Sequence, residues 1–170
     1  MNIFITSFII LEAVSHLDDI RLNKMILETA QLLSTAYREL FEDHRMIYKS
    51  THFNHPCTIW ARKNNNTFSW LVEYFNSLSQ EKIRRDHFLK DKAKIFPHKS
   101  WEILHEIFDN RAIYINHNEI KMDFFDFNCT DFKNEKDIRI SYQRHLTAKW
   151  DNDLRTPKWT GIDKPFFYQN

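Results

Sequence analysis

The spacing of hydrophobic residues predicts a chain built mainly from helices. Over residues 18–40, apolar side chains recur every three or four positions and form one stripe, made of Leu22, Met25, Ile26, Leu33, Ala36, Tyr37 and Leu40. Ser15 or Asp18 is suited to cap the start of this helix, because a short polar side chain accepts the unpaired amide groups there. The polar, mixed stretch that follows, 41–54, predicts a loop.

Similar signals predict four more helices. Pro56 fits a first helical position, where its missing N–H is of no consequence, and three asparagines at 64–66 separate that helix from the next, which Asn66 or Thr67 would cap. Pro97 opens a further amphipathic segment. The expected helices cover residues 56–62, 66–85, a stretch beginning at 97, and 137–150.

Three segments lack a helical pattern. The first eleven residues are apolar but too short to span a membrane, and they lack the basic start and cleavage site of a signal peptide, so we expect a buried strand or the first core segment. Residues 112–127 suggest two short strands around a turn, and the tail from residue 154 should be irregular. We therefore expect a mainly α protein, a compact helical bundle that forms one domain over residues 1–170. The bundle could include one short β-hairpin near residues 112–127.

Composition narrows the class of protein. The chain has 170 residues, of which 42% are hydrophobic and 15% aromatic, so intrinsic disorder is excluded. Gly161 is the one glycine of the sequence, so the chain cannot contain a glycine-rich phosphate-binding loop. A net charge of +1 means that any nucleic-acid surface must be a local patch. Two cysteines, Cys57 and Cys129, are too few for a disulfide scaffold and suit a reducing compartment. We therefore expect a cytoplasmic protein, located in the cytoplasm of the host cell if it is viral. We expect no membrane partner.

The sequence predicts no metal site and no cofactor. Nine histidines are present, but none has the HxxxH or HExxH spacing, and there is no CxxC motif. The nearest pair, His52 and His55, lies in a predicted loop without an obvious third ligand. No nucleophile elbow of the GxSxG type appears either.

A polar stripe on the first long helix is the strongest candidate for chemistry. At 100° per residue, Arg21, Lys24, Glu28 and Gln31 fall within about 80° of one another. They either form a solvated face with weak ion pairs or line a cleft with a carboxylate, two cations and an amide. In a cleft, Glu28 would act as a base or stabilise a developing cation.

A second candidate is the segment Asn54-His55-Pro56 with Trp60 and Arg62. A histidine beside a helix N-terminus is placed to bind phosphate, while a tryptophan and an arginine stack on or pair with nucleotides. The structural alternative is that Asn54 and His55 cap the helix and Trp60 packs in the core.

Two basic stretches are candidates for a phosphate-binding patch. The first holds Lys82, Arg84, Arg85, Lys90, Lys92, Lys94 and Lys99. The second, Lys149-Trp150 and Arg155-Thr156-Pro157-Lys158-Trp159, mixes cations with aromatics as surfaces that track a nucleic-acid backbone do. Either stretch is equally compatible with an ordinary solvated face.

Several of these residues resemble a pattern found in small uncharacterised proteins of phages and bacteria. Residues 17–24 read L-D-D-I-R-L-N-K and are followed by Glu28 and Gln31; N-H-P stands at 54–56, W-x-R at 60–62, and N-x-x-x-W-L at 66–71. A Lys-Trp pair followed by Pro-x-Trp completes the pattern near the end. The match covers most of the first 75 residues and part of the last 30, but not residues 95–134.

That group is distantly similar to the pyrimidine-dimer DNA glycosylases (endonuclease V), which are compact helical enzymes. The resemblance implies removal of a damaged pyrimidine, then strand cleavage through an imine on the N-terminal amine. Glu28 maps as the carboxylate near the sugar, with Arg21 and Lys24 as phosphate-binding neighbours. One departure is that Asn2 follows Met1, so we expect Met1 to be retained, whereas the family nucleophile is the amine of a small residue. The residues expected to bind DNA or a nucleotide are Asp19, Gln31, Asn54, His55, Trp60, Arg62, Arg155, Lys158 and Trp159.

Three functions remain open on the sequence. The first is a glycosylase or glycosylase/lyase acting on damaged or modified pyrimidines, which should hold Glu28 in an open groove with Arg21 and Lys24 at the rim. The second is a phage anti-defence or regulatory protein that sequesters a nucleotide ligand without turnover in a closed pocket. The third is a structural or host-interaction protein with Glu28 on a convex face. The sequence does not determine the oligomeric state.

Overall fold

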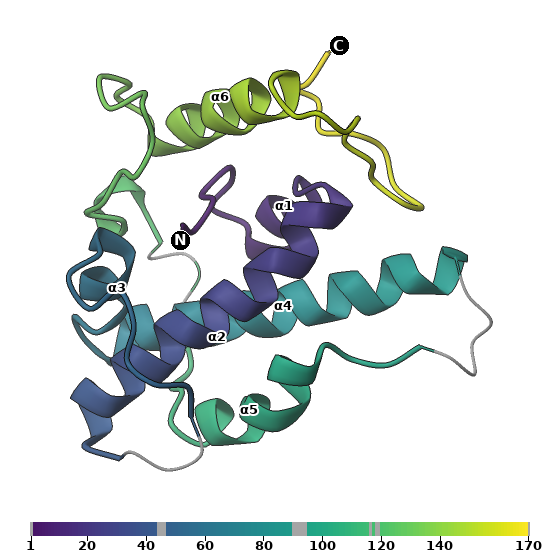
Figure 1. Ribbon diagram of the computed structural model, residues 1–170. Helices are drawn as coiled ribbons and strands as arrows, with labels where there is room; N and C mark the ends of the chain where they lie inside the picture. Colours follow the sequence, from purple (N-terminus) through teal and green to yellow (C-terminus); the bar gives the residue numbers. More distant parts are fainter. Residues whose placement is uncertain (1, 44–46, 90–94, 116, 118–119, 170) are drawn as a thin grey trace.

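The computed structural model describes residues 2–43, 47–89, 95–115, 117 and 120–169 (Figure 1). Over these residues the chain is helical and contains no strand, which confirms the mainly α prediction. The elements are α1 (Ile10–Ser15), α2 (Asp19–Phe41), α3 (Pro56–Ala61), α4 (Asn65–Leu89), α5 (Lys99–Asp109), the 3-10 turn η3 (Met122–Phe124) and α6 (Ile138–Asp151).

The helix α1 was not predicted, whereas the other helices lie close to their predicted positions and differ from the prediction in their caps. Asp18 occupies the N-cap of α2 without capping it through its side chain, which is engaged elsewhere. Asn64, rather than Asn66 or Thr67, starts α4, because its side-chain oxygen accepts the Thr67 N–H at 3.0 Å. Glu42 ends α2 in the left-handed conformation, with φ 51°.

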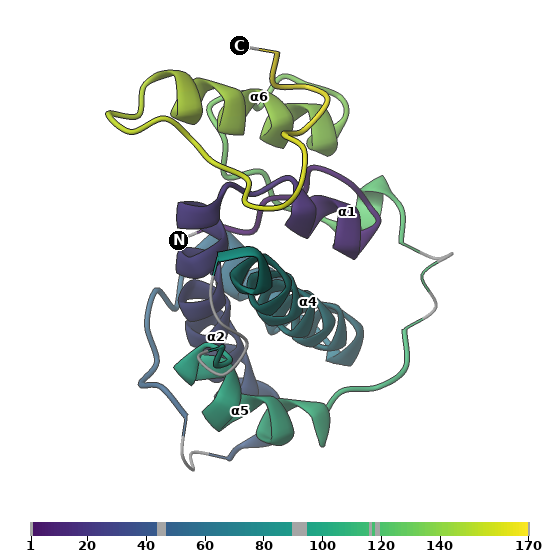
Figure 2. The ribbon, with the colours of Figure 1, turned by 90° about the vertical axis from the view of Figure 1, so that its right-hand side faces the viewer.

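The helices are arranged in layers. Figure 2 shows α6 and the C-terminal tail on one side, α1, α2 and α4 in the middle, and α5 on the opposite side. The long helices α2 and α4 contribute more buried hydrophobic residues than the other helices, including Leu33, Ala36, Trp70 and Phe75. None of the helices in the described part combines the length and hydropathy needed to span a membrane.

The N-terminal segment joins the α6 layer to the middle layer. Ile3 and Ile5 are fully buried in irregular structure, so this segment is a core element and not a strand. Its polar groups contact α6, where the Tyr142 hydroxyl donates to Asn2 Oδ1 at 3.0 Å and the Gln143 amide donates to the Thr6 carbonyl at 2.9 Å.

The hairpin predicted near residues 112–127 is wrong for the described part of that segment; residues 116, 118 and 119 lie outside it. Instead of pairing with a second strand, the Ile113 N–H donates to the Ser69 hydroxyl on α4 at 2.7 Å. Phe125 and Phe127 are buried against Trp60 of α3, with ring centroids 5.6 and 5.3 Å away. The apolar residues that suggested strands therefore pack their rings against helices.

The tail from residue 154 is irregular, as predicted, and folds back over the start of α2. The Asp19 N–H donates to the Lys158 carbonyl at 2.8 Å. Gly161 turns the chain just beyond this contact with a φ of 71°, a value that L residues rarely adopt, and a Cβ there would lie 2.3 Å from the Phe88 ring. The one glycine of the chain thus stands at a turn that favours glycine.

Candidate functional site

The polar stripe of α2 lines a cavity of about 790 Å³. The other walls come from the N-terminal segment, from α6 and from the first residues of the tail. The lining residues are Asn2, Phe4, Ile20, Arg21, Lys24, Met25, Glu28, Cys129, His145, Lys149, Asn152, Asp153, Leu154 and Arg155.

Glu28 is the carboxylate on the α2 wall of the cavity. Its side chain is 15% exposed, and its Oε1 lies 3.4 Å from the Lys24 ammonium, which is 68% exposed. The helical spacing explains the arrangement, since residues four apart lie above one another on the same face. A shielded carboxylate with an exposed cation at its side can accept a proton or stabilise a developing positive charge.

Arg21 lies on the same wall but is held by two carboxylates. Its guanidinium donates to Asp18 at 2.9 Å and to Asp153 at 2.8 Å. Asp18 is almost fully buried and also accepts the Trp150 indole N–H at 2.8 Å. Arg21 therefore already has two acidic partners, one at the start of α2 and one just beyond the end of α6, and these pairs join the two helices. Its expected contact with phosphate stays a prediction.

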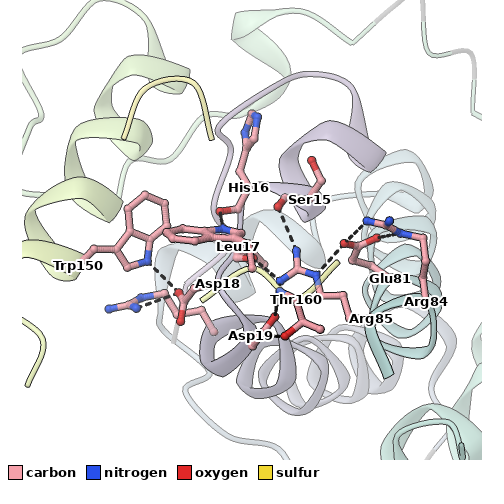
Figure 3. A network of polar contacts seen from close by, with 12 residues as sticks. Ser15, His16, Leu17, Asp18, Asp19, Glu81, Arg84, Arg85, Trp150 and Thr160 are labelled. Carbon is pink, nitrogen blue, oxygen red and sulfur yellow. Dashed lines mark hydrogen bonds and ion pairs between the residues drawn. The ribbon is translucent and has the colours of Figure 1, made fainter. Parts of the chain in front are cut away.

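Asp19 belongs to a structural network and not to the cavity at Glu28 (Figure 3). Its carboxylate accepts the Thr160 hydroxyl at 2.7 Å and the Arg85 guanidinium at 2.9 Å. Arg85 also donates to the carbonyls of Leu17 and Ser15, at 2.8 and 3.0 Å. These contacts fix the start of α2 relative to α4 and the tail, and Asp19 also lines a separate hollow beside the cavity.

The rim of the cavity is cationic. Lys24, Lys149 and Arg155 line it, and within the described residues neither Lys149 nor Arg155 takes part in an ion pair. A second hollow of about 460 Å³ shares Ile20 and Arg155 with the first and adds Asp19, Thr156 and Lys158. The positive charge predicted for the tail therefore lies beside the Glu28 cavity.

A third hollow of about 630 Å³ continues along the tail past Lys158 and Trp159. Trp159 is half-buried, and its indole N–H donates to the His16 carbonyl at 2.9 Å. Its ring packs against Trp150, with centroids 5.0 Å apart. The predicted stacking residue thus anchors the tail and leaves one part of its surface in the third hollow.

His55, from the second candidate segment at residues 54–62, lies close enough to Glu28 for their charges to interact. Burial lowers the pKa of His55, and the positive charge of His52 adds to this effect while the negative charge of Glu28 opposes it. Asn54 is exposed, and Gln31 is absent from the cavity lining, so the structure brings neither of them to the Glu28 cavity.

Trp60 packs in the core, as the structural alternative expected, and Arg62 contacts a neighbouring ring. Trp60 is 1% exposed, and its indole N–H donates to the Phe124 carbonyl at 2.8 Å, so its faces are taken up by the core. The Arg62 guanidinium lies 3.5 Å from the centre of the Phe53 ring, a cation–π contact away from the cavity. We therefore leave both residues out of the proposed interface.

The first basic stretch is largely paired within the protein. Lys82 bonds Asp86 at 2.7 Å, and Arg84 and Arg85 both bond Glu81. Lys99 is exposed on α5, in the layer opposite α6, and residues 90–94 lie outside the described part of the chain (Figure 2). Over its described residues this stretch gives no phosphate-binding patch beside the cavity.

A group of possible metal ligands was not predicted. Single ligand atoms of His55, Cys57 and Cys129 lie within 4.8 Å of one another, and the two sulfur atoms are 3.7 Å apart. A hydrogen bond from the Cys57 thiol lowers the pKa of Cys129. Motif spacing misses this group because Cys129 is 72 residues from Cys57.

Sequence reasoning also missed several cavity residues, namely Asn2, His145, Asn152, Asp153 and Leu154. Most of them surround the Lys149-Trp150 pair at the end of α6, which was noted for its charge. The run of polar residues after that helix end could have indicated these residues, because binding groups are often found in loops at the ends of helices.

Residues 1–95 match the family described as pyrimidine dimer DNA glycosylase. The chain belongs to this family. The match includes Arg21, Lys24 and Glu28 on the α2 wall, whereas α6 and the tail lie beyond it. Membership in the pyrimidine dimer DNA glycosylase family supports a glycosylase-related function and DNA as the partner. No curated protein and no solved structure matches the chain.

Proposed function

We propose that this protein is a DNA glycosylase that removes a damaged or modified pyrimidine in the cavity at Glu28. The observation that carries the proposal is a shielded carboxylate inside a cavity of about 790 Å³ whose rim is cationic. That volume lies in the range of small-molecule sites, roughly 300–1,000 Å³, so a nucleotide turned out of the helix has room to enter.

The proposed reaction breaks the bond between C1′ of the sugar and the pyrimidine nitrogen. The electron pair of that bond leaves with the base, so positive charge develops on the sugar ring. Glu28 stabilises this charge and takes the proton of the nucleophile that adds to C1′. For hydrolysis the nucleophile is water. The imine route predicted from the family would use the amine of Met1, which lies outside the described residues.

The rim residues account for binding of the DNA strand. Lys24, Lys149 and Arg155 line the Glu28 cavity, and Arg155 and Lys158 line the second hollow. Cations grouped in this way neutralise phosphates and release counterions. Arg21 has a different part, because its ion pairs with Asp18 and Asp153 hold the two walls of the cavity together.

Two exposed apolar residues stand beside these cations. Leu154 is fully exposed and lines the Glu28 cavity, and Ile20, also exposed, lines both hollows. Enzymes and architectural proteins that distort DNA insert apolar side chains between base steps. Leu154 is accordingly the residue that would fill the space left by an extruded nucleotide.

The deciding experiment offers the protein duplexes that carry a pyrimidine dimer, a modified pyrimidine or an abasic site, beside an undamaged duplex. We expect base release from one class of damaged pyrimidine. Borohydride added during the reaction traps an imine if an amine is the nucleophile and traps nothing if water is. Tight binding of a free nucleotide, with no base released from any duplex, would favour the sequestering protein instead.

A further inference from the structure

A cluster of sulfur and nitrogen atoms lies where α3 meets the segment that leads into α6. His55 is the N-cap of α3, Cys57 lies in its first turn, and Cys129 comes from the segment between η3 and α6. Their ligand atoms all lie within 4.8 Å of one another. Cys57 is fully buried, and Cys129 is half-buried and also lines the Glu28 cavity.

We propose that His55, Cys57 and Cys129 form a binding site for one thiophilic divalent metal ion, of which Zn²⁺ is the representative. Imidazole nitrogen and thiolate sulfur are the ligands that this class of ion prefers. The site is independent of the reaction proposed above, because neither Glu28 nor a base takes part in it.

The distance between the sulfur atoms fits this use. Two thiolates on a tetrahedral zinc ion, each about 2.3 Å from the metal, stand roughly 3.8 Å apart. The Sγ atoms of Cys57 and Cys129 are 3.7 Å apart, so an ion can bind between them with little movement. A disulfide would require the sulfur atoms to approach further and would leave His55 without a part in the cluster.

The surroundings supply polar partners for the ligands. The Cys129 N–H donates to the Tyr142 hydroxyl at 3.2 Å, and that hydroxyl donates to Asn2 Oδ1, which lies 3.8 Å from Cys57 Sγ. Such outer contacts orient metal ligands. Metal binding would replace existing hydrogen bonds. The two thiols would lose the protons by which they contact each other and Asn2 Oδ1. Nδ1 of His55 would give up the Cys57 N–H, which it accepts at 3.3 Å, because a neutral imidazole has one unprotonated nitrogen.

A bound ion would change how the cavity is held together. It would tie α3 to the segment that leads into α6, and α6 supplies His145 and Lys149 to the cavity. Two thiolates and a divalent ion are neutral together, which suits a buried position. Three protein ligands leave a fourth position for water or another small ligand.

The test measures metal binding by the reduced, full-length protein under anaerobic conditions. After incubation with Zn²⁺ and removal of unbound ion, elemental analysis should find about one zinc per chain. Co²⁺ in its place should give a sulfur-to-metal charge-transfer band. In competition with a chromophoric chelator, Cys129→Ser and His55→Asn should each bind zinc at least about tenfold more weakly than the unaltered protein.

The variants are chosen so that folding does not confuse the result. Asn is a favoured N-cap residue, so His55→Asn keeps α3 capped while removing the ring nitrogen. His52→Asn is the control, because the His52 ring stands 6.4 Å from that of His55 and Asn tolerates the positive φ of 49° there. It should bind zinc like the unaltered protein.

Three results would overturn the site. One is less than about a tenth of an equivalent of zinc in the reduced protein. Another is unchanged zinc affinity in both ligand variants. A third is recovery of the freshly purified protein two hydrogens lighter, with both thiols in a disulfide that forms whether or not zinc is present. None of these depends on glycosylase activity, so failure of the metal site and failure of the proposed reaction are told apart.

Discussion

The Lys24 ammonium stands 3.4 Å from the Glu28 carboxylate, and the two side chains differ greatly in exposure. Lys24 is largely in solvent at the rim, whereas Glu28 is shielded on the cavity wall. An exposed i,i+4 pair contributes only about 0.3–0.5 kcal/mol to helix stability. The pair therefore gives Glu28 little structural value, and its place in the cavity makes it the first residue to test.

Glu28→Gln should lower single-turnover base release by at least about a hundredfold, the lower range for general acid–base groups. The change keeps the size of the side chain and removes its charge. Affinity for damaged DNA should persist or increase, because a negative charge near the phosphates is lost. Rate, affinity and melting temperature are measured on the same preparation.

The control is Glu39→Gln, which makes the same chemical change on an exposed part of α2. It should leave the rate unchanged. If Glu28→Gln also releases base at the normal rate and costs under about 1 kcal/mol of stability, the role of Glu28 is limited to weak pairing such as that with Lys24. The catalytic assignment would then end, and the binding-protein alternative would lead.

Replacing Lys149 and Arg155 together by Gln should weaken DNA binding and reduce its dependence on salt. Each lost phosphate contact lowers the slope of log K against log salt by about 0.9, so the double variant should lose about 1.8. Lys99→Gln, on α5 in the opposite layer, is the control and should keep the full slope (Figure 2). An unchanged slope in the double variant would place the DNA elsewhere.

Leu154→Ala should impair extrusion of the nucleotide more than it impairs folding. Leu154 is fully exposed, so its truncation removes little from the core. A fluorescent base analogue opposite the lesion reports unstacking, and its signal on binding should fall in Leu154→Ala. Leu11→Ala truncates another exposed leucine, on α1, and should keep the signal. Equal signals in all three proteins would remove the wedge role.

Local patterns predicted every helix of the described residues except the six-residue α1, because a longer helix buries a stripe that repeats every three or four residues. The 112–127 segment was predicted wrongly for a physical reason. Its aromatic residues suit a strand by propensity, but Phe125 and Phe127 fill a space beside Trp60 on α3. Strand propensity reports how well a side chain packs on neighbours, and here the neighbours are helices.

The candidate site was predictable only where it lies on one helix. Arg21, Lys24 and Glu28 meet on the cavity wall because helical geometry brings them together. Asn2 and His145 come from distant segments, and no spacing rule reports on tertiary packing. Because spacing rules do not report on tertiary packing, they also could not predict the ion pairs of Arg21.

Stability should depend on pH through His16. Its ring is buried, with Nδ1 2.9 Å from the Thr6 hydroxyl, and burial lowers its pKa below the ordinary 6.5 while Glu12 partly opposes this. As pH falls below 6.5, the unfolded chain takes up a proton that the folded chain resists, so the free energy of unfolding falls until the folded pKa is passed.

Urea unfolding across that range should show the loss in the unaltered protein and a smaller loss in His16→Gln, which has no titrating ring. The histidines at 55, 98 and 145 also have pKa values lowered by burial, so some decline remains in the variant. Parallel declines in the two proteins would show that His16 contributes nothing to the pH dependence.

Arg84 and Arg85 give the sharpest test of how the cavity is supported, since both bond Glu81. Arg85 is 3% exposed and also binds Asp19 and two backbone carbonyls, whereas Arg84 is half in solvent. Arg85→Ala leaves buried acceptors without a donor and should cost about 3–5 kcal/mol. Arg84→Ala should cost less than about 1 kcal/mol, because exposed pairs contribute little. Urea unfolding of both variants measures the difference.

Arg85 holds the start of α2, and the tail that carries Arg155 is bonded to this part of α2 through Asp19. Loss of the Arg85 side chain should therefore also weaken DNA binding. Similar small costs for the two variants would mean that the network in Figure 3 does not support the cavity.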